Sequence, residues 1–167
     1  MNKALVSLLI IVLLGCTVNA QEVKDNAYQL MLDKLLTHNV KEVSVQEAVI
    51  EGLGIEVLDA RELEEYNVSR IKGAKWIGYD DFDMKRVEDI DTQSTILVYC
   101  SVGYRSEKIV QRLKRAGYKN VSNLYGGIFE WVNQGRPVYD VNNKETKNVH
   151  AFSKEWGVWL NKGNKVY

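Results

Sequence analysis

The sequence has few cysteines and histidines, and this scarcity argues against several classes of site. Its 167 residues include two cysteines, Cys16 and Cys100, and two histidines, His38 and His150. No C-x-x-C pair occurs, which argues against intramolecular dithiol redox chemistry. The histidines lie far apart, with no second histidine, cysteine pair or carboxylate at ligand spacing. We therefore expect neither a metal site nor a cofactor.

The chain also lacks an excess of charge and a hydrophobic run of membrane-spanning length. It carries 22 Lys and Arg residues against 22 Asp and Glu residues, and no basic patch interrupts this balance. Nucleic acid is therefore not an expected partner. The uncharged apolar run from Ala4 to Leu14 has eleven residues. A transmembrane helix needs about twenty, so this run is too short to be a retained membrane span.

The N-terminus has the composition of a bacterial secretory signal. Lys3 precedes the apolar run and small residues follow it, which predicts a signal over residues 1–20. Two cleavage sites fit. Leu13–Cys16 resembles a lipobox, in which Cys16 would be acylated and tether the protein to a membrane, whereas Val18–Ala20 suits ordinary signal peptidase. Either site predicts a periplasmic protein or tethered lipoprotein of the cell envelope, with secretion as the alternative.

One cysteine follows an apolar strand and begins a short loop that leads into a helix. Residues 96–99 predict a buried strand, Gly103 allows a tight turn, and Ser106 predicts the cap of a helix over 107–116. Cys100 then faces a helix N-terminus, where free N–H groups and the helix dipole favour a thiolate. The alternative is that Cys100 is a small buried hydrophobic residue. Its position at a strand end, where open α/β sheets bind ligands, favours a functional thiol.

Strands alternate with helices along the chain, which predicts a parallel sheet covered on both faces. We expect strands at 43–45, 55–59, 74–77, 96–99 and 121–124, and helices at 26–38, 46–51, 62–66, 82–90, 107–116 and from 127 to near Gln134.

These elements divide the chain after its signal into an N-terminal helix within 21–40, a domain at 41–139 and a C-terminal tail at 140–167. In the tail, residues 142–147 are expected to form a solvated linker. The apolar segment 149–160, with three aromatic side chains at helical spacing, is expected to pack on its own domain. A contact with a partner or a membrane surface is the alternative.

Three blocks of the sequence carry motifs in a fixed order: Val57–Tyr66 with Arg70–Ala74, the Cys100–Ser106 loop, and Gly117–Val121 with Leu124–Trp131. Together they resemble the signatures of the rhodanese family of sulfurtransferases, single-domain type. A lone C-x4-R pattern would be weak evidence, whereas three ordered blocks in the expected strand and helix contexts are strong. Arg70 departs from the family pattern, which usually has histidine there.

The resemblance implies an α/β fold, an open parallel sheet of about five strands with helices on both faces. It also implies that Cys100 attacks the outer sulfur of a donor such as thiosulfate and holds that sulfur as a persulfide. Cyanide or a thiol would then accept the sulfur, as in thiosulfate sulfurtransferases, and a protein acceptor is not identified. The cradle around the sulfur is assigned by resemblance to residues 101–105: Ser101, Val102, Gly103, Tyr104 and Arg105.

Three further residues, Asp59, Arg61 and Ser106, are expected to support the loop. Arg105 has two alternative roles. It could bind an anionic donor through its guanidinium, or turn inward to hold Asp59 or Glu65. The inward role is favoured, because carboxylates near the core otherwise lack partners.

Two questions of function stay open at this point. Ser101 and Val102 are uncharged where basic side chains would help to bind thiosulfate, so a persulfide-bearing small thiol or protein is an alternative donor. A binding module that keeps the fold without catalysis is an alternative to an enzyme. Phosphatases and arsenate reductases use C-x5-R loops, whereas Cys100 and Arg105 form C-x4-R, a tighter cradle that argues against oxyanion chemistry.

Overall fold

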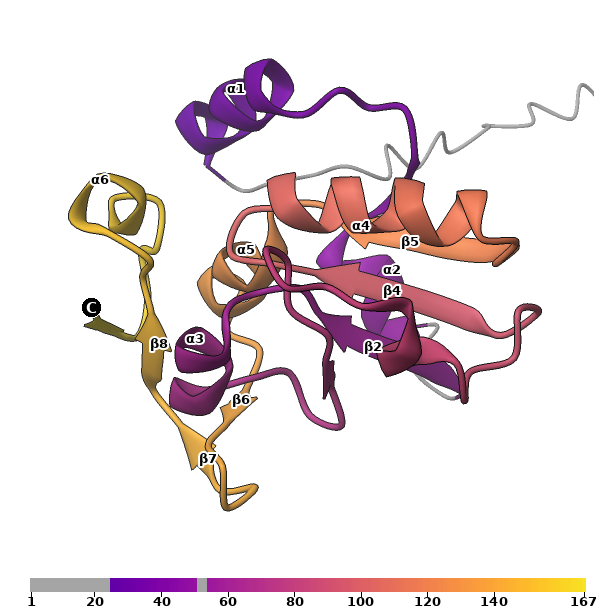
Figure 1. Ribbon diagram of the computed structural model, residues 1–167. Coiled ribbons are helices and arrows are strands. Elements are labelled where there is room, and N and C mark those ends of the chain that lie inside the picture. The colour runs from indigo at the N-terminus through magenta and orange to yellow at the C-terminus, as the bar shows by residue number, and fades with distance from the viewer. Residues whose placement is uncertain (1–24, 51–53) are drawn as a thin grey trace, which may run out of the picture.

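A computed structural model of the protein describes residues 25–50 and 54–167. The expected signal at 1–20, including Cys16, therefore lies outside the described residues, as does Glu51 at the end of one expected helix. A sheet with strand order β1-β5-β4-β2-β3 forms the centre, and every neighbouring pair in it is parallel. The predicted open parallel α/β sheet is confirmed (Figure 1). Its strands are β1 Lys41–Val43, β2 Ile55–Asp59, β3 Lys75–Trp76, β4 Thr95–Tyr99 and β5 Asn120–Leu124.

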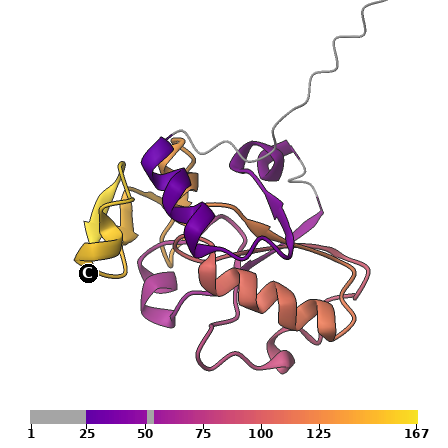
Figure 2. The same ribbon diagram turned by 90° about the horizontal axis from the view of Figure 1, so that it is seen from above.

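Both faces of the sheet are buried, as the apolar run in β4 shows. Ile96 and Val98 belong to one hydrophobic cluster, which includes helix α4 (Tyr104–Arg115). Leu97 and Tyr99 belong to the other, which includes α1 (Asn26–Leu35), α2 (Val45–Ile50) and α5 (Gly127–Asn133). Successive side chains of a strand point to opposite faces, so a strand covered on both faces is apolar throughout. Figure 2 shows α4 on one side of the sheet and α2 with α5 on the other, which confirms the predicted helices on both faces.

Two shorter elements lie between the strands: α3 (Leu63–Val68) and the 3₁₀ turn η1 (Met84–Val87). The helix predicted over 82–90 is wrong apart from this turn. Asp83 starts it by accepting a hydrogen bond from the backbone N–H of Lys85. Only Val87 and Ile90 are buried in this stretch, so it lacks the apolar stripe that would hold a longer helix against the sheet.

Side chains set two boundaries that differ from the prediction. Helix α1 ends three residues early, because the buried Glu107 carboxylate accepts hydrogen bonds from the backbone N–H groups of Thr37 and His38, each at 3.0 Å. Strand β1 ends at Val43, two residues before the predicted end, because α2 starts directly after Ser44. The Ser44 hydroxyl accepts from the N–H of Glu47 at 3.2 Å, and the Glu47 carboxylate accepts from the N–H of Ser44 at 2.7 Å. This reciprocal cap fixes the start of α2.

The C-terminal tail packs on the same domain and shares its core. It forms a β6–β7 hairpin (Val138–Tyr139 and Glu145–Thr146), a parallel pair of β8 (Asn148–His150) with β9 (Asn164–Val166), and the short helix α6 (Lys154–Gly157). Residues 142–147 are mostly exposed, as expected of a solvated segment, but the expected linker is wrong in that Glu145–Thr146 form the second strand of this hairpin. Three tail residues, Val149, Ala151 and Leu160, join the cluster that holds α1 and α5. Trp159 stacks on Tyr28 of α1 with ring centroids 5.5 Å apart.

Candidate active site

The thiol of Cys100 lies directly after β4, at the carboxyl end of the parallel sheet. The residue is 1% exposed, and the backbone N–H of Gly103 donates to its Sγ at 3.1 Å. Gly103 has φ +110°, in the left-handed region that glycine adopts without strain, and it is the N-cap of α4. Helix α4 therefore begins at Tyr104, before the predicted start at 107. Its N-terminus lies next to the sulfur, where the helix dipole favours negative charge.

The carbonyl groups of the loop are held by the helix on the other side of the sheet. The N–H groups of Ile128 and Phe129, at the start of α5, donate to the carbonyl oxygens of Cys100 and Ser101 at 2.9 and 3.1 Å. These bonds use N–H groups that a helix cannot pair internally. The loop is therefore fixed between the start of α4 and the start of α5.

Asn123 is a positioning residue that the sequence analysis missed. It is buried in β5, and its amide Nδ2 donates to the carbonyl oxygen of Gly103 at 3.0 Å. Its Oδ1 accepts from the Ser106 hydroxyl at 2.7 Å. Ser106 was expected to cap α4; this is wrong, since it lies inside the helix and supports the loop through Asn123. The sequence signal that could have identified Asn123 is an amide side chain in a strand predicted to be buried, because buried amides require hydrogen-bond partners.

Gly127 provides a test of how tightly α5 and the Cys100 loop are packed. At φ +58°, a Cβ on this residue would collide with the backbone carbonyl groups of Cys100 and Ser101. We expect Gly127→Ala to lower the free energy of unfolding by about 2 kcal/mol or more, measured by urea denaturation. The matched control is Gly73→Ala, at φ +75° with nothing within 4 Å of its Cβ, which should cost about 1 kcal/mol from backbone strain alone. An equal loss of unfolding free energy in the two variants would contradict the close contact between Gly127 and the Cys100 loop.

Arg105 is turned inward and pairs with Glu65 of α3. Its Nη1 and Nη2 donate to the two carboxylate oxygens of Glu65 at 2.6 and 2.8 Å, and Nη2 also donates to the Ser101 hydroxyl at 2.9 Å. The Ser101 hydroxyl donates to Glu65 at 2.8 Å. Of the two partners considered from the sequence, Glu65 is the one bound. Burial opposes ionisation of both groups, but their pairing outweighs it: the pKa of Glu65 is lowered and the pKa of Arg105 is raised.

Asp59 and Arg61 form a second, fully buried pair behind the loop. The Nη2 of Arg61 donates to the Asp59 carboxylate at 2.6 Å and also to the carbonyl oxygen of Ser69 at 2.6 Å. The Tyr99 hydroxyl donates to the same carboxylate at 2.5 Å. This network ties the ends of β2 and β4 together. Its electrostatic link to the loop runs through Glu65, whose pKa the Arg61 charge helps to lower.

A cavity of about 350 Å³ opens above Cys100. Four of the predicted cradle residues line it together with the cysteine: Ser101, Val102, Tyr104 and Arg105. Gly103, the fifth, donates its N–H to the sulfur but is not part of the lining. The remaining lining residues come from elsewhere in the chain, and the sequence analysis did not place them here: Leu35, Glu62, Tyr79, Asp80, Phe152 and Trp156. The cavity therefore combines the family loop with side chains from α1 and the tail.

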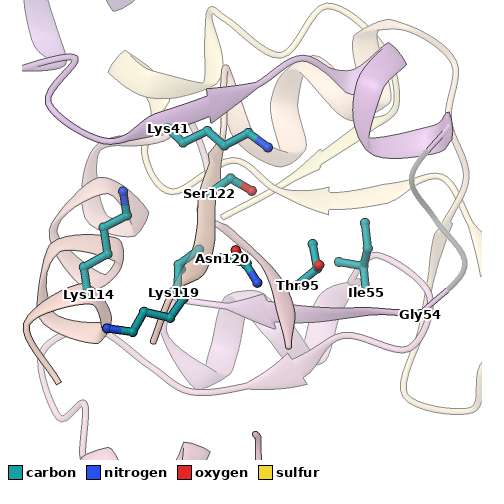
Figure 3. A pocket seen from close by; sticks show the side chains of 9 residues that line it. Lys41, Gly54, Ile55, Thr95, Lys114, Lys119, Asn120 and Ser122 are labelled. Atoms are coloured by element: carbon teal, nitrogen blue, oxygen red, sulfur yellow. The ribbon is translucent and has the colours of Figure 1, made fainter. Parts of the chain in front are cut away.

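A second cavity, of about 430 Å³, lies at the amino ends of the strands, opposite Cys100 (Figure 3). Three lysines surround it, Lys41, Lys114 and Lys119, with Thr95, Asn120 and Ser122 between them. Its lining includes no thiol, carboxylate or histidine. Of these two cavities, the one at Cys100 is therefore the one that contains a thiol.

The family model for the rhodanese-like domain matches residues 42–134, more than half of the chain. The protein belongs to the rhodanese-like family. The predicted family membership is confirmed. The matched segment runs from within β1 to the end of α5 and includes the Cys100 loop, but it excludes α1 and the tail. Within residues 25–50 and 54–167, no helix has the length and hydropathy needed to cross a bilayer. The same residues include no cluster of three or more histidine, cysteine or acidic side chains able to hold a metal ion.

Several curated proteins and solved structures are similar to this rhodanese-like chain. A putative sulfur carrier protein, YrkF of Bacillus subtilis, is 32% identical over 77 residues, covering 46% of this chain and 41% of the relative. A probable adenylyltransferase/sulfurtransferase, MoeZ of Mycobacterium tuberculosis, is 28% identical over 87 residues, covering 52% of this chain and 22% of the relative. A tRNA uridine(34) hydroxylase of Listeria welshimeri is 34% identical over 119 residues, covering 65% of this chain and 34% of the relative. The chain thus spans less than half the length of each of these relatives.

Among solved structures, thiosulfate sulfurtransferase from Pseudomonas aeruginosa aligns with TM-score 0.56 at 20% identity, covering 80% of this chain and 25% of that chain. A protein from Bacillus halodurans aligns with TM-score 0.55 at 23% identity, covering 68% of this chain and 84% of that chain. At these identities the likeness concerns the fold. The chain thus has a rhodanese-like domain whose relatives include a putative sulfur carrier protein and a probable adenylyltransferase/sulfurtransferase.

Proposed function

We propose that the protein carries sulfane sulfur on Cys100 and transfers it from a thiosulfate or persulfide donor to a thiol or cyanide acceptor. The observation that carries this proposal is the buried Cys100 thiol at the base of an open cavity, with the Gly103 N–H donated to its sulfur. An N–H donor and a helix N-terminus both stabilise negative charge on sulfur, and the thiolate is the nucleophile in such reactions. The sulfur carrier and sulfurtransferase relatives support the same chemistry.

The transfer would take place in two displacements at sulfur. In the first, the Cys100 thiolate attacks the outer sulfur of the donor; a bond to Cys100 forms, the donor bond to that sulfur breaks, and sulfite or a thiolate leaves. In the second, the acceptor attacks the outer sulfur of the Cys100 persulfide, and the Cys100 thiolate leaves with its electron pair. The product is thiocyanate or a new persulfide. No external oxidant is needed, and no general base is needed once Cys100 is ionised.

Protein residues would act in this cycle by holding the loop and its charge. Gly103 donates to the sulfur, and the positive charge of Arg105 lies near enough that a Cys100 thiolate contributes to its raised pKa. Because Arg105 is bound to Glu65, it would act on Cys100 through the loop and through its field rather than as a free anion receptor.

The direct test is the intact mass of the full chain carrying Cys16→Ser, so that Cys100 is its remaining thiol. The reduced protein is treated with thiosulfate or a small-molecule persulfide, freed of excess donor, and weighed before and after cyanide. We expect a gain of one sulfur atom that cyanide removes. A folded protein that gains no sulfur from any donor would instead be a binding module, and the proposal would be wrong.

We further propose that the protein is exported to the cell envelope, on the basis of the N-terminal sequence. Cells expressing the natural chain and a Cys16→Ser variant would be labelled with radioactive palmitate, and the N-terminus of the purified protein determined. Label in the natural chain alone indicates lipobox cleavage, whereas an unlabelled protein that begins at Gln21 indicates signal peptidase. An unlabelled protein that retains residues 1–20 would contradict export.

A further inference from the structure

A turn of the C-terminal tail brings two aromatic side chains to the Cys100 cavity. Phe152 and Trp156, on either side of the start of α6, both line it, although they lie outside the matched family segment. Figure 1 shows β8 beside α3, on the side of the sheet where β4 ends, and α6 farther along the chain beyond the end of β8. The Phe152 ring lies 5.1 Å from the guanidinium carbon of Arg105. The tail therefore contributes to the site as well as to the core.

The backbone of this turn holds Phe152 in an unusual conformation. Phe152 has φ +64°, in the left-handed region that large side chains rarely adopt, and its side chain remains half-exposed. Its flanks are fixed: the N–H of Ala151 donates to Val166 at 2.8 Å, and the Ser153 hydroxyl accepts from the N–H of Trp156 at 3.4 Å. The aromatic ring is thus held over the cavity by structure on both sides, and burial of that ring in its own core does not explain its position.

The charges around the cavity disfavour a small dianion. Arg105 is the one cationic side chain in the lining, and Glu65 neutralises it through two hydrogen bonds, with a Glu62 oxygen also 3.8 Å away. Glu62 and Asp80 add two carboxyl groups to the lining. Like charges at close range repel, and more strongly so where water is partly excluded. A donor with two negative charges, such as thiosulfate, would meet this repulsion without a free cation to offset it.

The rest of the wall is apolar or aromatic. Leu35 of α1, Val102 of the loop and Tyr79 face the same cavity as the two tail aromatics. Such a lining favours a hydrocarbon or aromatic group on the donor, because burial of apolar surface on both partners is favourable.

We infer that the cavity selects donors whose transferable sulfur is attached to an apolar, preferably aromatic, group with at most one negative charge. Phe152 and Trp156 are the specificity-determining residues. This inference rests on the proposed function of Cys100. The corresponding loading step with an aryl thiosulfonate is balanced: the Cys100 thiolate bonds to the outer sulfur, the sulfur–sulfur bond of the donor breaks, and an aryl sulfinate leaves with the electron pair.

The test compares two donors with the same charge and the same reacting atoms. Benzenethiosulfonate and methanethiosulfonate are both monoanions and differ in the phenyl or methyl group. Rate constants for sulfur loading of Cys100 would be measured by intact mass at timed intervals, with N-acetylcysteine as the reference for intrinsic reactivity. We define the phenyl-to-methyl ratio as the loading rate constant with benzenethiosulfonate divided by that with methanethiosulfonate. We expect this ratio for the protein to exceed the ratio for N-acetylcysteine by about tenfold or more. Thiosulfate should load more slowly than methanethiosulfonate.

Variants then assign the preference to the tail. Phe152→Ala and Trp156→Ala should each lower the phenyl-to-methyl ratio by about threefold or more. The matched control is Val158→Ala, an exposed apolar residue of the same tail that does not line the cavity and should leave the ratio unchanged. Circular dichroism and thermal unfolding would check that each variant is folded.

The outcomes separate this inference from the proposed function. If the protein's ratio equals that of N-acetylcysteine, or if neither tail variant lowers it, the apolar donor class is wrong while Cys100 loading stands. If neither these three donors nor a small-molecule persulfide loads Cys100 in the folded protein, the proposed function itself fails. The comparison with N-acetylcysteine needs no variant, so unfolding of Trp156→Ala would not remove the test.

Discussion

Replacing Cys100 by serine should abolish sulfur loading while the protein keeps its fold. A serine hydroxyl is a far poorer nucleophile toward sulfur than a thiolate, so we expect the loading rate to fall by on the order of a thousandfold or more. The serine oxygen can accept the Gly103 N–H in place of Sγ, and the volume change is small. The free energy of unfolding should therefore change by no more than about 1 kcal/mol.

The measurement is intact mass after donor treatment, with urea denaturation of both proteins. Both chains would carry Cys16→Ser, so that the comparison concerns one thiol. Sulfur on the Cys100→Ser protein that cyanide removes would contradict the proposed mechanism. Loss of loading together with loss of the folded state would be resolved by Cys100→Ala, which keeps a small buried side chain without a nucleophile.

Replacing Glu65 by glutamine should cause a large loss of stability. The Glu65 and Arg105 side chains are 3% and 13% exposed, and Glu65 also accepts from Ser101 and from the N–H of Glu62. Removing one partner of a buried pair leaves the other charge without compensation, which costs about 3–5 kcal/mol. The control is Asp89→Asn, whose partner Lys75 is 39% exposed; such surface pairs contribute about 0–1 kcal/mol.

The same variant has a defined pH signature. Pairing with Arg105 lowers the folded-state pKa of Glu65 below its ordinary value of 4.5. Its contribution to stability is therefore fully present above that value and is lost as the pH falls through the lowered folded-state pKa. The stability difference between the natural protein and Glu65→Gln should shrink as the pH falls below about 4.5. Urea titrations at several pH values would measure it, and a difference that does not change with pH would show that Glu65 is not ionised in the pair.

The strand pattern and the cysteine loop could be predicted because their signals are local. The stretch 96–99 is apolar at every position, and it forms the buried part of β4. The start of α4 could not be placed, because its N-cap is Gly103, which has no side chain to signal a cap. Ser106 offered the usual capping hydroxyl nearby, but in the folded chain it donates to Asn123, a residue from the neighbouring strand. A tertiary contact of this kind has no local sequence pattern.

The site itself was only partly predictable. Residues 100–105 are contiguous, so their shared position followed from the loop motif. The choice of Glu65 over Asp59 as the Arg105 partner depends on Arg61, which already holds Asp59 in a separate buried pair. The spacing of the tail aromatics predicted packing on the domain, but which aromatics face Cys100 depends on the left-handed turn at Phe152. The surrounding hydrogen bonds, rather than the residue type at position 152, determine this left-handed backbone conformation.

The stacking of Trp159 on Tyr28 has a consequence for how this protein can be divided. The family segment at 42–134 excludes α1 and the tail, yet both cover one face of its sheet, next to side chains such as Leu97 and Ile128. A fragment cut at those family limits would leave this apolar face in contact with water, and exposed patches of that kind promote aggregation. The smallest unit that buries both sheet faces therefore extends at least from α1 to Leu160, the last tail residue of this core.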